Sequence, residues 1–232
     1  TGKAVLKLAA LNVVRAHSIV VGESAGAGSL GMSGELTLAP STTLHADTIE
    51  IAKGPAAEGK VQLPKDGHLR LRGREGGNTR VKIALASGAA ETPTPGAAVL
   101  DLAGGTTYAK ISTLDTLAGG THASVTIAFG AGTIDADAIT LRKGEKPTTL
   151  TLAGTTLVVN QTLTIEEGAV VTLALPDPAA TAARASLRMP ATPETNRALL
   201  ENYIKTGQIN TTVPNATLAL REEGANLIVE AK

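Results

Sequence analysis

One phrase occurs three times along the chain, and it constrains the fold more than any other feature of the sequence. Each copy is a short alternating strand, a small-residue corner and a Thr pair that opens another strand. The copies span Leu36–Thr43, Leu100–Thr107 and Leu150–Leu157. Self-similarity of this kind is the signature of a solenoid, in which each repeat forms a coil that stacks on its neighbours.

A second repeated phrase predicts where each coil turns. It occurs at Val14–Gly22, Leu44–Ile51 and Ile134–Leu141, and consists of an apolar residue, Ala two positions later, Ile five later and an aliphatic residue seven later. Residues that alternate along one strand are separated by even steps, so the odd step from Ala to Ile breaks the alternation. We therefore expect a strand, a corner between the Ala and the Ile, and a second strand.

Period-2 alternation over four to six residues, bounded by Gly, Pro, Ser or Asn, recurs almost to residue 176. This pattern predicts half-buried strands, and no helical period interrupts them, which excludes ordinary βαβ units. The copies of the first phrase start at residues 36, 100 and 150, so their spacing is uneven. Coils of roughly 20 to 25 residues with inserted loops explain this spacing. One insertion is expected at 88–96, since Pro93 and Pro95 cannot serve a central ladder.

The pattern changes after residue 176. Thr192 is the expected N-cap of a helix over about 193–206, with Pro193 in its first turn and Gly207 as the C-cap. A hairpin is expected over about 217–230. We predict an all-β protein: a parallel β-solenoid at 1–176, and at 177–232 a helix-plus-hairpin cap that covers the open end of the solenoid.

The strand phrases resemble the parallel β-helical repeats of bacterial surface and autotransporter-type passenger proteins. The residues that carry the resemblance are Leu100–Tyr108 and Leu150–Gly168, with Leu-x-Leu-Ala-Gly, paired Thr and a following Thr-Leu-Thr-Ile. The similarity extends over about residues 30–175. It implies an exported, structural or adhesive role and supplies no catalytic residues.

Composition excludes several classes of partner. The chain has 21 basic and 21 acidic residues and a formal net charge of zero, which argues against a nucleic-acid partner. The longest basic cluster, His68–Arg74, alternates with Leu and is interpreted as the solvated face of a strand. There is no Cys, so neither a disulfide nor a thiolate site is possible. No apolar run approaches a membrane span. Because the first residue is Thr1, we expect an export signal to have been removed.

Asp135 and Asp137 are the candidate chemical pair. Two residues apart on a strand, they are expected to project from one face, where two carboxylates can act as acid and base on a glycosidic bond or hold Ca²⁺. The equivalent positions of the other copies are Arg15 with His17 and His45 with Asp47. Positions that vary in this way are typical of a solvated face, which is the favoured interpretation. The acid pair belongs to an alternative function.

No metal site and no cofactor are predicted. The four histidines, His17, His45, His68 and His122, fall in different copies, and none has the spacing of a helical zinc site. His45 and Asp47 share a face and form the best available pair for a weakly held metal. A surface role is the favoured interpretation of both.

These observations predict a non-enzymatic, exported structural protein of a cell-surface layer, matrix, adhesin or filament. Its expected partner is itself, through strand addition or stacking of solenoids, with residues 1–14 as a candidate donated strand. The alternative is a polysaccharide-active β-helix enzyme or carbohydrate-binding module. Ice binding ranks third, because Thr149 and Thr151 suggest an ordered Thr rank, although the equivalent copies place other residues there.

Overall fold

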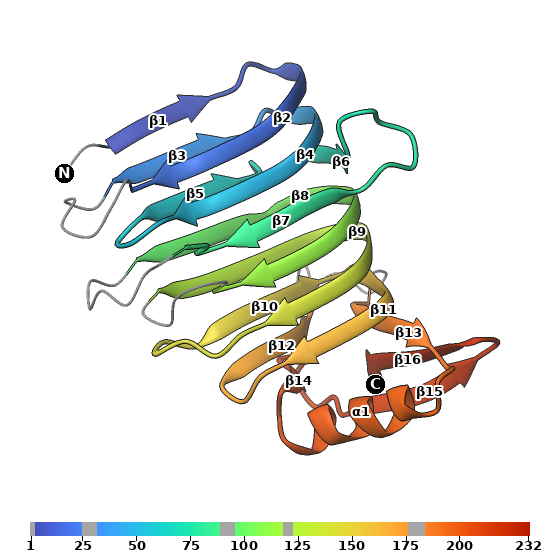
Figure 1. Ribbon diagram of the computed structural model, residues 1–232. Coiled ribbons are helices and arrows are strands. Elements are labelled where there is room, and N and C mark those ends of the chain that lie inside the picture. The colour runs from blue at the N-terminus through green and yellow to red at the C-terminus, as the bar shows by residue number, and fades with distance from the viewer. Residues whose placement is uncertain (1–2, 25–31, 89–95, 118–122, 176–183) are drawn as a thin grey trace.

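Short alternating segments form strands that pair in parallel with the same segment of the next coil (Figure 1). The computed structural model describes residues 3–24, 32–88, 96–117, 123–175 and 184–232. The coils build a β-solenoid of about 6 turns, with 65% of the chain in strands and a short helix near the C-terminus. The predicted fold class is therefore confirmed.

Three parallel ladders run along the solenoid, and each coil contributes one strand segment to each ladder. The first ladder consists of β1 (Lys3–Lys7), β3 (Ser33–Thr37), β5 (Glu58–Gln62), the starts of β8 (Ala97–Thr116) and β9 (Ser124–Leu141), β10 (Thr148–Ala153), β12 (Ala169–Ala174) and β14 (Ile209–Thr211). The second ladder consists of the starts of β2 (Leu11–Glu23) and β4 (Ser41–Lys53), β6 (His68–Arg72), the middles of β8 and β9, the start of β11 (Thr155–Ile165), and β13 (Ser186–Pro190). The third ladder consists of the ends of β2 and β4, β7 (Val81–Leu85), and the ends of β8, β9 and β11.

The corner between the second and third ladders lies where the second phrase places it. Ala46 and Ala136 are fully buried there, and β4 and β9 continue through the corner as long bent strands (Figure 1). The register between β9 and β11 shifts at the same corner, between Val159 and Thr162. The equivalent positions of the neighbouring coils hold Ile111 and Val159, which are also fully buried, so the corner accepts larger aliphatic side chains as well as Ala. The predicted turn between Ala and Ile is confirmed.

The core is a set of aliphatic columns, because the same inward position of each coil holds an apolar residue. In the first ladder Leu36, Leu100 and Leu150, which open the three copies of the first phrase, fall in one column. Val61 and Ile127 occupy the coils between them, which explains the uneven spacing of the phrase. Each of these five side chains is at most 8% exposed. Burying one such side chain contributes roughly 1.5–3 kcal/mol.

The C-terminal segment forms a helix, α1 (Thr195–Lys205), and a hairpin of β15 (Leu218–Glu223) and β16 (Asn226–Ala231). The prediction of Thr192 as N-cap is wrong, because Glu194 precedes the first turn and its side chain makes no capping hydrogen bond. The Asn196 side chain instead donates to the Pro190 carbonyl at 3.0 Å and fixes the start of the helix. The C-cap is Thr206 rather than the predicted Gly207, which follows it with φ +78°.

Two expectations fall partly outside the described residues. The predicted insertion at 88–96 includes residues 89–95, and the predicted boundary at 176–177 lies within 176–183. Beyond that boundary, β14 extends the first ladder and β13 extends the second. The parallel stack therefore includes strands from the C-terminal segment.

Candidate functional site

At the C-terminal end of the solenoid, the second and third ladders are covered by elements of the same chain, and the first ladder ends at the three-residue strand β14. On the first ladder β14 pairs with β12, and on the second β16 pairs antiparallel with β13. On the third, the Tyr203 hydroxyl of α1 accepts the Ile165 N–H at 3.0 Å and donates to the Leu163 carbonyl at 3.4 Å. Leu200 and Tyr203 are buried against the core. Elements of the same chain therefore continue or cover each ladder, although β14 has no partner strand on its outer edge among the described residues.

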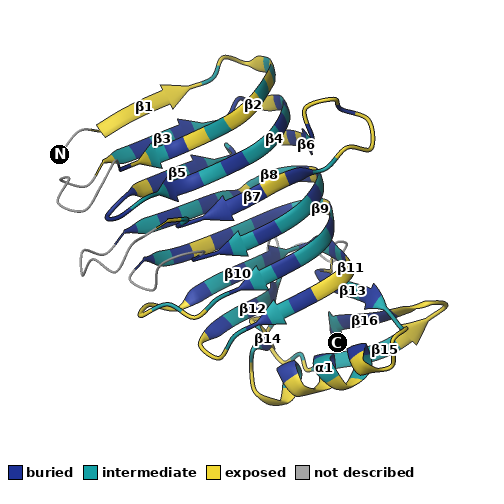
Figure 2. Cartoon of the chain, in the orientation of Figure 1, coloured by how far each residue is buried: buried dark blue, intermediate teal, exposed yellow. Residues whose placement is uncertain are grey.

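The N-terminal end has no such cover among the described residues. There β1 pairs only with β3 and β2 only with β4, so each presents a free edge. Leu6 occupies the same inward column as Leu36 and yet is 58% exposed. Leu11 and Val13 are 74% and 72% exposed, and Figure 2 shows β1 exposed throughout. Among the described residues, β1 and β2 therefore have no partner strand on their outer edge.

Asp135 and Asp137 lie in an ion-pair network that joins four coils. The Arg80 guanidinium contacts both carboxylates, at 2.9 Å from Asp135 and 3.3 Å from Asp137. The Asn160 side-chain amide donates to both, at 2.7 and 3.3 Å, and Lys110 lies 3.8 Å from Asp135. The two carboxylates are thus brought together, as the sequence predicts, but each has a cationic partner.

The electrostatics of this network favour ionised carboxylates. Burial raises the pKa of Asp135, but hydrogen bonds from Asn160 and Arg80 outweigh burial and hold that pKa below its ordinary value. A carboxyl that donates a proton to a leaving group needs a raised pKa instead. What the arrangement does physically is tie neighbouring coils together. The catalytic role of Asp135 and Asp137 stays a prediction.

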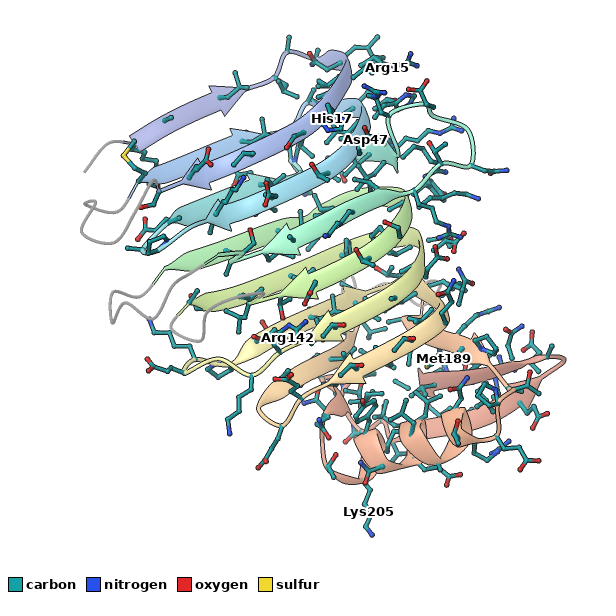
Figure 3. All side chains as sticks on the ribbon, viewed as in Figure 1. Arg15, His17, Asp47, Arg142, Met189 and Lys205 are labelled. Carbon is teal, nitrogen blue, oxygen red and sulfur yellow. The ribbon has the colours of Figure 1, made fainter. Side chains whose placement is uncertain are left out.

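The histidines do not gather. His17 Nδ1 lies within hydrogen-bond distance of the Asp47 carboxylate, at 2.7 Å, at the bend of β2 and β4 shown in Figure 3, and Arg74 lies 3.5 Å from the same carboxylate. Asp47 is therefore engaged by residues other than His45, the partner weighed from the sequence. Within the described ranges, which omit His122, no group of three His, Asp or Glu side chains could hold a metal ion.

Sequence reasoning missed a column of basic residues on the outer face of the second ladder. Arg15 pairs in register with His45, and His45 with Arg72. Leu71 pairs with Ala109, which places Lys110 next to Arg72. Arg70, two residues before Arg72 and on the same outer face of β6, is exposed. We call Arg15, His45, Arg72 and Lys110 the basic column. The one feature of the sequence that indicates this column is that Arg15 and His45 occupy equivalent positions of the second repeated phrase.

The Thr residues of the first ladder form no continuous rank. Thr126 and Thr149 share an outward column, but Glu35 and Lys60 occupy the same column in earlier coils. The neighbouring column includes Thr151 and also Asp101. Ordered rows of Thr are therefore limited to short stretches of this face.

Comparison of the chain with models of known protein families, with curated protein sequences and with solved structures found no match. Helix α1 has 11 residues, and no helix in the described part of the chain is long and apolar enough to cross a membrane. A fold of this class hosts many functions, so the function has to be argued from the surfaces described above.

Proposed function

We propose that the chain is a non-enzymatic structural protein of a bacterial cell-surface layer, matrix, adhesin or filament, that it is exported, and that its N-terminal edge joins a second copy. The observation that supports this most directly is the difference between the two ends. An exposed sheet edge presents unpaired N–H and C=O groups and is a template for further strands. The repeats also resemble those of bacterial surface and autotransporter-type passenger proteins.

The partner that best matches the N-terminal edge is the same edge of a second copy of the chain. Three ladder edges lie around a strip of apolar side chains, of which Leu6 is 58% exposed. Leu8, Val14 and Ile19 are only partly buried against the core. A second copy supplies three edges at the same spacing and an apolar strip to cover these residues. A partner with a single strand would satisfy one ladder alone.

The covered C-terminal end limits this mode of assembly. Head-to-tail stacking needs two complementary open ends, whereas an interface between two identical edges is isologous and closes at two copies. In such a pair β1 faces β1 of the partner in antiparallel orientation. A pair of these 232-residue chains is then a rod of two solenoids with the helix and hairpin at each outer end.

Sedimentation velocity at micromolar concentration tests the proposal. The 232-residue chain is expected to form a dimer, and Leu6→Lys is expected to give a monomer because it places a charge in the joined apolar strip. Thr126→Lys, at an exposed position of a central coil, serves as the matched control and should leave the dimer intact. A monomeric parent chain, or a dimer that both variants leave unchanged, would contradict the proposal.

The alternative function, a polysaccharide-active enzyme, depends on Asp135 and Asp137. Both carboxylates are engaged by Arg80 and Asn160, which supports the structural role. Cleavage of an acidic polysaccharide that Asp135→Ala abolishes would favour the enzyme instead.

A further inference from the structure

We propose that the basic column and its neighbours Arg70 and Tyr108 bind a linear polyanion, and that this ligand is an acidic polysaccharide. The inference does not depend on assembly through the N-terminal edge. It rests on the stacking of cations along the second ladder, on the shortage of counter-charges around them and on one exposed aromatic ring.

The solenoid converts scattered residues into a regular array. Adjacent coils of a sheet are about 4.8 Å apart, so Arg15, His45, Arg72 and Lys110 follow one another at that step along the solenoid axis. The next residue of the column is Asp135, which pairs with Lys110 in register and ends the basic run. The array is therefore linear, parallel to the axis and four coils long.

These cations lack counter-charges from the chain itself. Within the described residues, Arg15, Arg70 and Arg72 form no ion pair, although the protein as a whole is neutral. Lys110 lies 3.8 Å from Asp135, but that carboxylate lies closer to Arg80, at 2.9 Å. Arg72 and Lys110 lie on neighbouring coils, and like charges at that spacing repel unless an anion comes between them.

Two buried nitrogen atoms in the column also lack hydrogen-bond partners. They are His45 Nδ1 and Arg72 Nε, on adjacent coils. Burial and then the charges of Arg15, Arg70 and Arg72 lower the pKa of His45, and burial and then Arg70 lower the pKa of Arg72. The Asp135 carboxylate partly offsets these charges at Arg72, and an anionic ligand would neutralise the remainder. Guanidinium groups bind carboxylate, sulfate and phosphate through charge-assisted, often bidentate hydrogen bonds.

The exposed aromatic ring favours a sugar polymer. Tyr108 is 52% exposed and pairs in register with Arg70, whereas Phe129 and Tyr203, the other aromatic residues of the chain, are buried. A tyrosine ring offers an apolar face to a pyranose ring and a hydroxyl to its oxygens. Proteins that bind single-stranded nucleic acid stack successive bases on several aromatic side chains. One ring beside a line of cations fits an acidic polysaccharide better.

Binding of polygalacturonate, measured by calorimetry at low and high salt, tests the proposal. The parent chain is expected to bind polygalacturonate and not neutral dextran, with affinity that falls as salt rises. Arg15→Gln with Arg70→Gln should weaken binding about tenfold or more, since each removes hydrogen bonds between charged groups. The matched control, Lys60→Gln with Lys82→Gln, removes the same charge from the other two ladders and should leave affinity within about twofold.

Three results would overturn the proposal. The first is no binding of polygalacturonate at low salt. The second is equal weakening of binding by both double variants, which would show nonspecific electrostatic attraction rather than a defined binding site. The third is tighter binding of a single-stranded oligonucleotide than of polygalacturonate, with Tyr108→Ala removing it, which would identify a nucleic acid as the ligand. Arg15 and Arg70 are both exposed, so their substitution should preserve the thermal unfolding midpoint, and this is checked alongside binding.

Discussion

The two ends of the solenoid are built from the same ladders and differ in what covers them. At the C-terminal end α1, β14 and β16 supply partners for the last coil, and Leu200 and Tyr203 complete the apolar core. At the N-terminal end Leu6 stands in an inward column and is 58% exposed. In a solenoid each coil contacts only its neighbours, so the contribution of a residue depends on whether both neighbours are present. The position of a coil along the solenoid therefore decides how much its inward apolar side chains contribute to stability.

The largest expected effect comes from shortening one side chain of the same inward column in the middle of the solenoid and another at its N-terminal edge. Leu150→Ala, in a fully buried position between two coils, is expected to lower the free energy of unfolding by about 2–5 kcal/mol because it leaves a cavity. Leu6→Ala should cost well under 1 kcal/mol in the monomer. Urea denaturation of both variants measures the difference. Equal costs would mean that the N-terminal edge is covered in solution.

A second test concerns the cover of the third ladder. Tyr203→Phe removes the hydroxyl that accepts the Ile165 N–H, and the buried N–H then lacks a partner. We expect a loss of about 1–3 kcal/mol and faster hydrogen exchange at the Ile165 amide. Tyr108→Phe, which removes an exposed hydroxyl, is the matched control and should change stability by less than about 0.5 kcal/mol. Equal effects would argue against a covering role for Tyr203.

A third test concerns the ion-pair network of Asp135, which lies in the middle coils, away from both ends of the solenoid. The pKa of Asp135 lies below its ordinary value, because Asn160 and Arg80 outweigh the effect of burial. The unfolded chain therefore binds the proton more readily, and the stabilisation is present above the ordinary pKa and lost as pH falls through the lower folded value. Asp135→Asn should cost about 1 kcal/mol at neutral pH and less in acid. Denaturation at several pH values measures this.

The control for this third test is Asp66→Asn, because Asp66 is exposed. The free-energy cost of Asp66→Asn should be small, because Asp66 belongs to none of the ion pairs of the described residues. A cost of Asp135→Asn that stays constant down to pH values below the ordinary carboxyl range would contradict the assigned network.

The smallest expected effect concerns charge at the open edge. An antiparallel pair of β1 strands centred on Val5 places Lys3 opposite Lys7 of the partner. Lys7→Glu replaces both like-charge contacts by ion pairs, each worth about 0.2–1 kcal/mol, and should tighten the dimer. Lys60→Glu, in a central coil, is the control for overall charge. A weaker dimer for Lys7→Glu in sedimentation equilibrium would rule out this pairing.

The repeats and corners were predictable because they depend on local alternation. Leu36, Leu100 and Leu150 fell in one column, and Ala46 and Ala136 at one corner, as the phrases indicate. The helix and hairpin of the cap were predictable for the same reason. The N-cap was not, because Asn196 fixes the helix start through the Pro190 carbonyl, a contact that no capping pattern encodes.

The surfaces were harder to predict because they depend on register between distant coils. Arg15 and His45 occupy equivalent positions of a repeated phrase, but the coils of Arg72 and Lys110 lack that phrase and could not be aligned with it. Arg80 likewise meets Asp135 across 55 residues. Local patterns set the inside of the solenoid, whereas its outer face emerges only when the coils are stacked.

The most direct test of the account compares hydrogen exchange at the two ends as protein concentration is varied. We predict slow exchange of the β14 and β16 amides at every concentration. Amides of β1 and β2 should exchange fast when the chain is dilute and become protected as it associates, and Leu6→Lys should abolish that change. Protection of β1 and β2 that does not vary with concentration, or unprotected β14 and β16, would contradict the account.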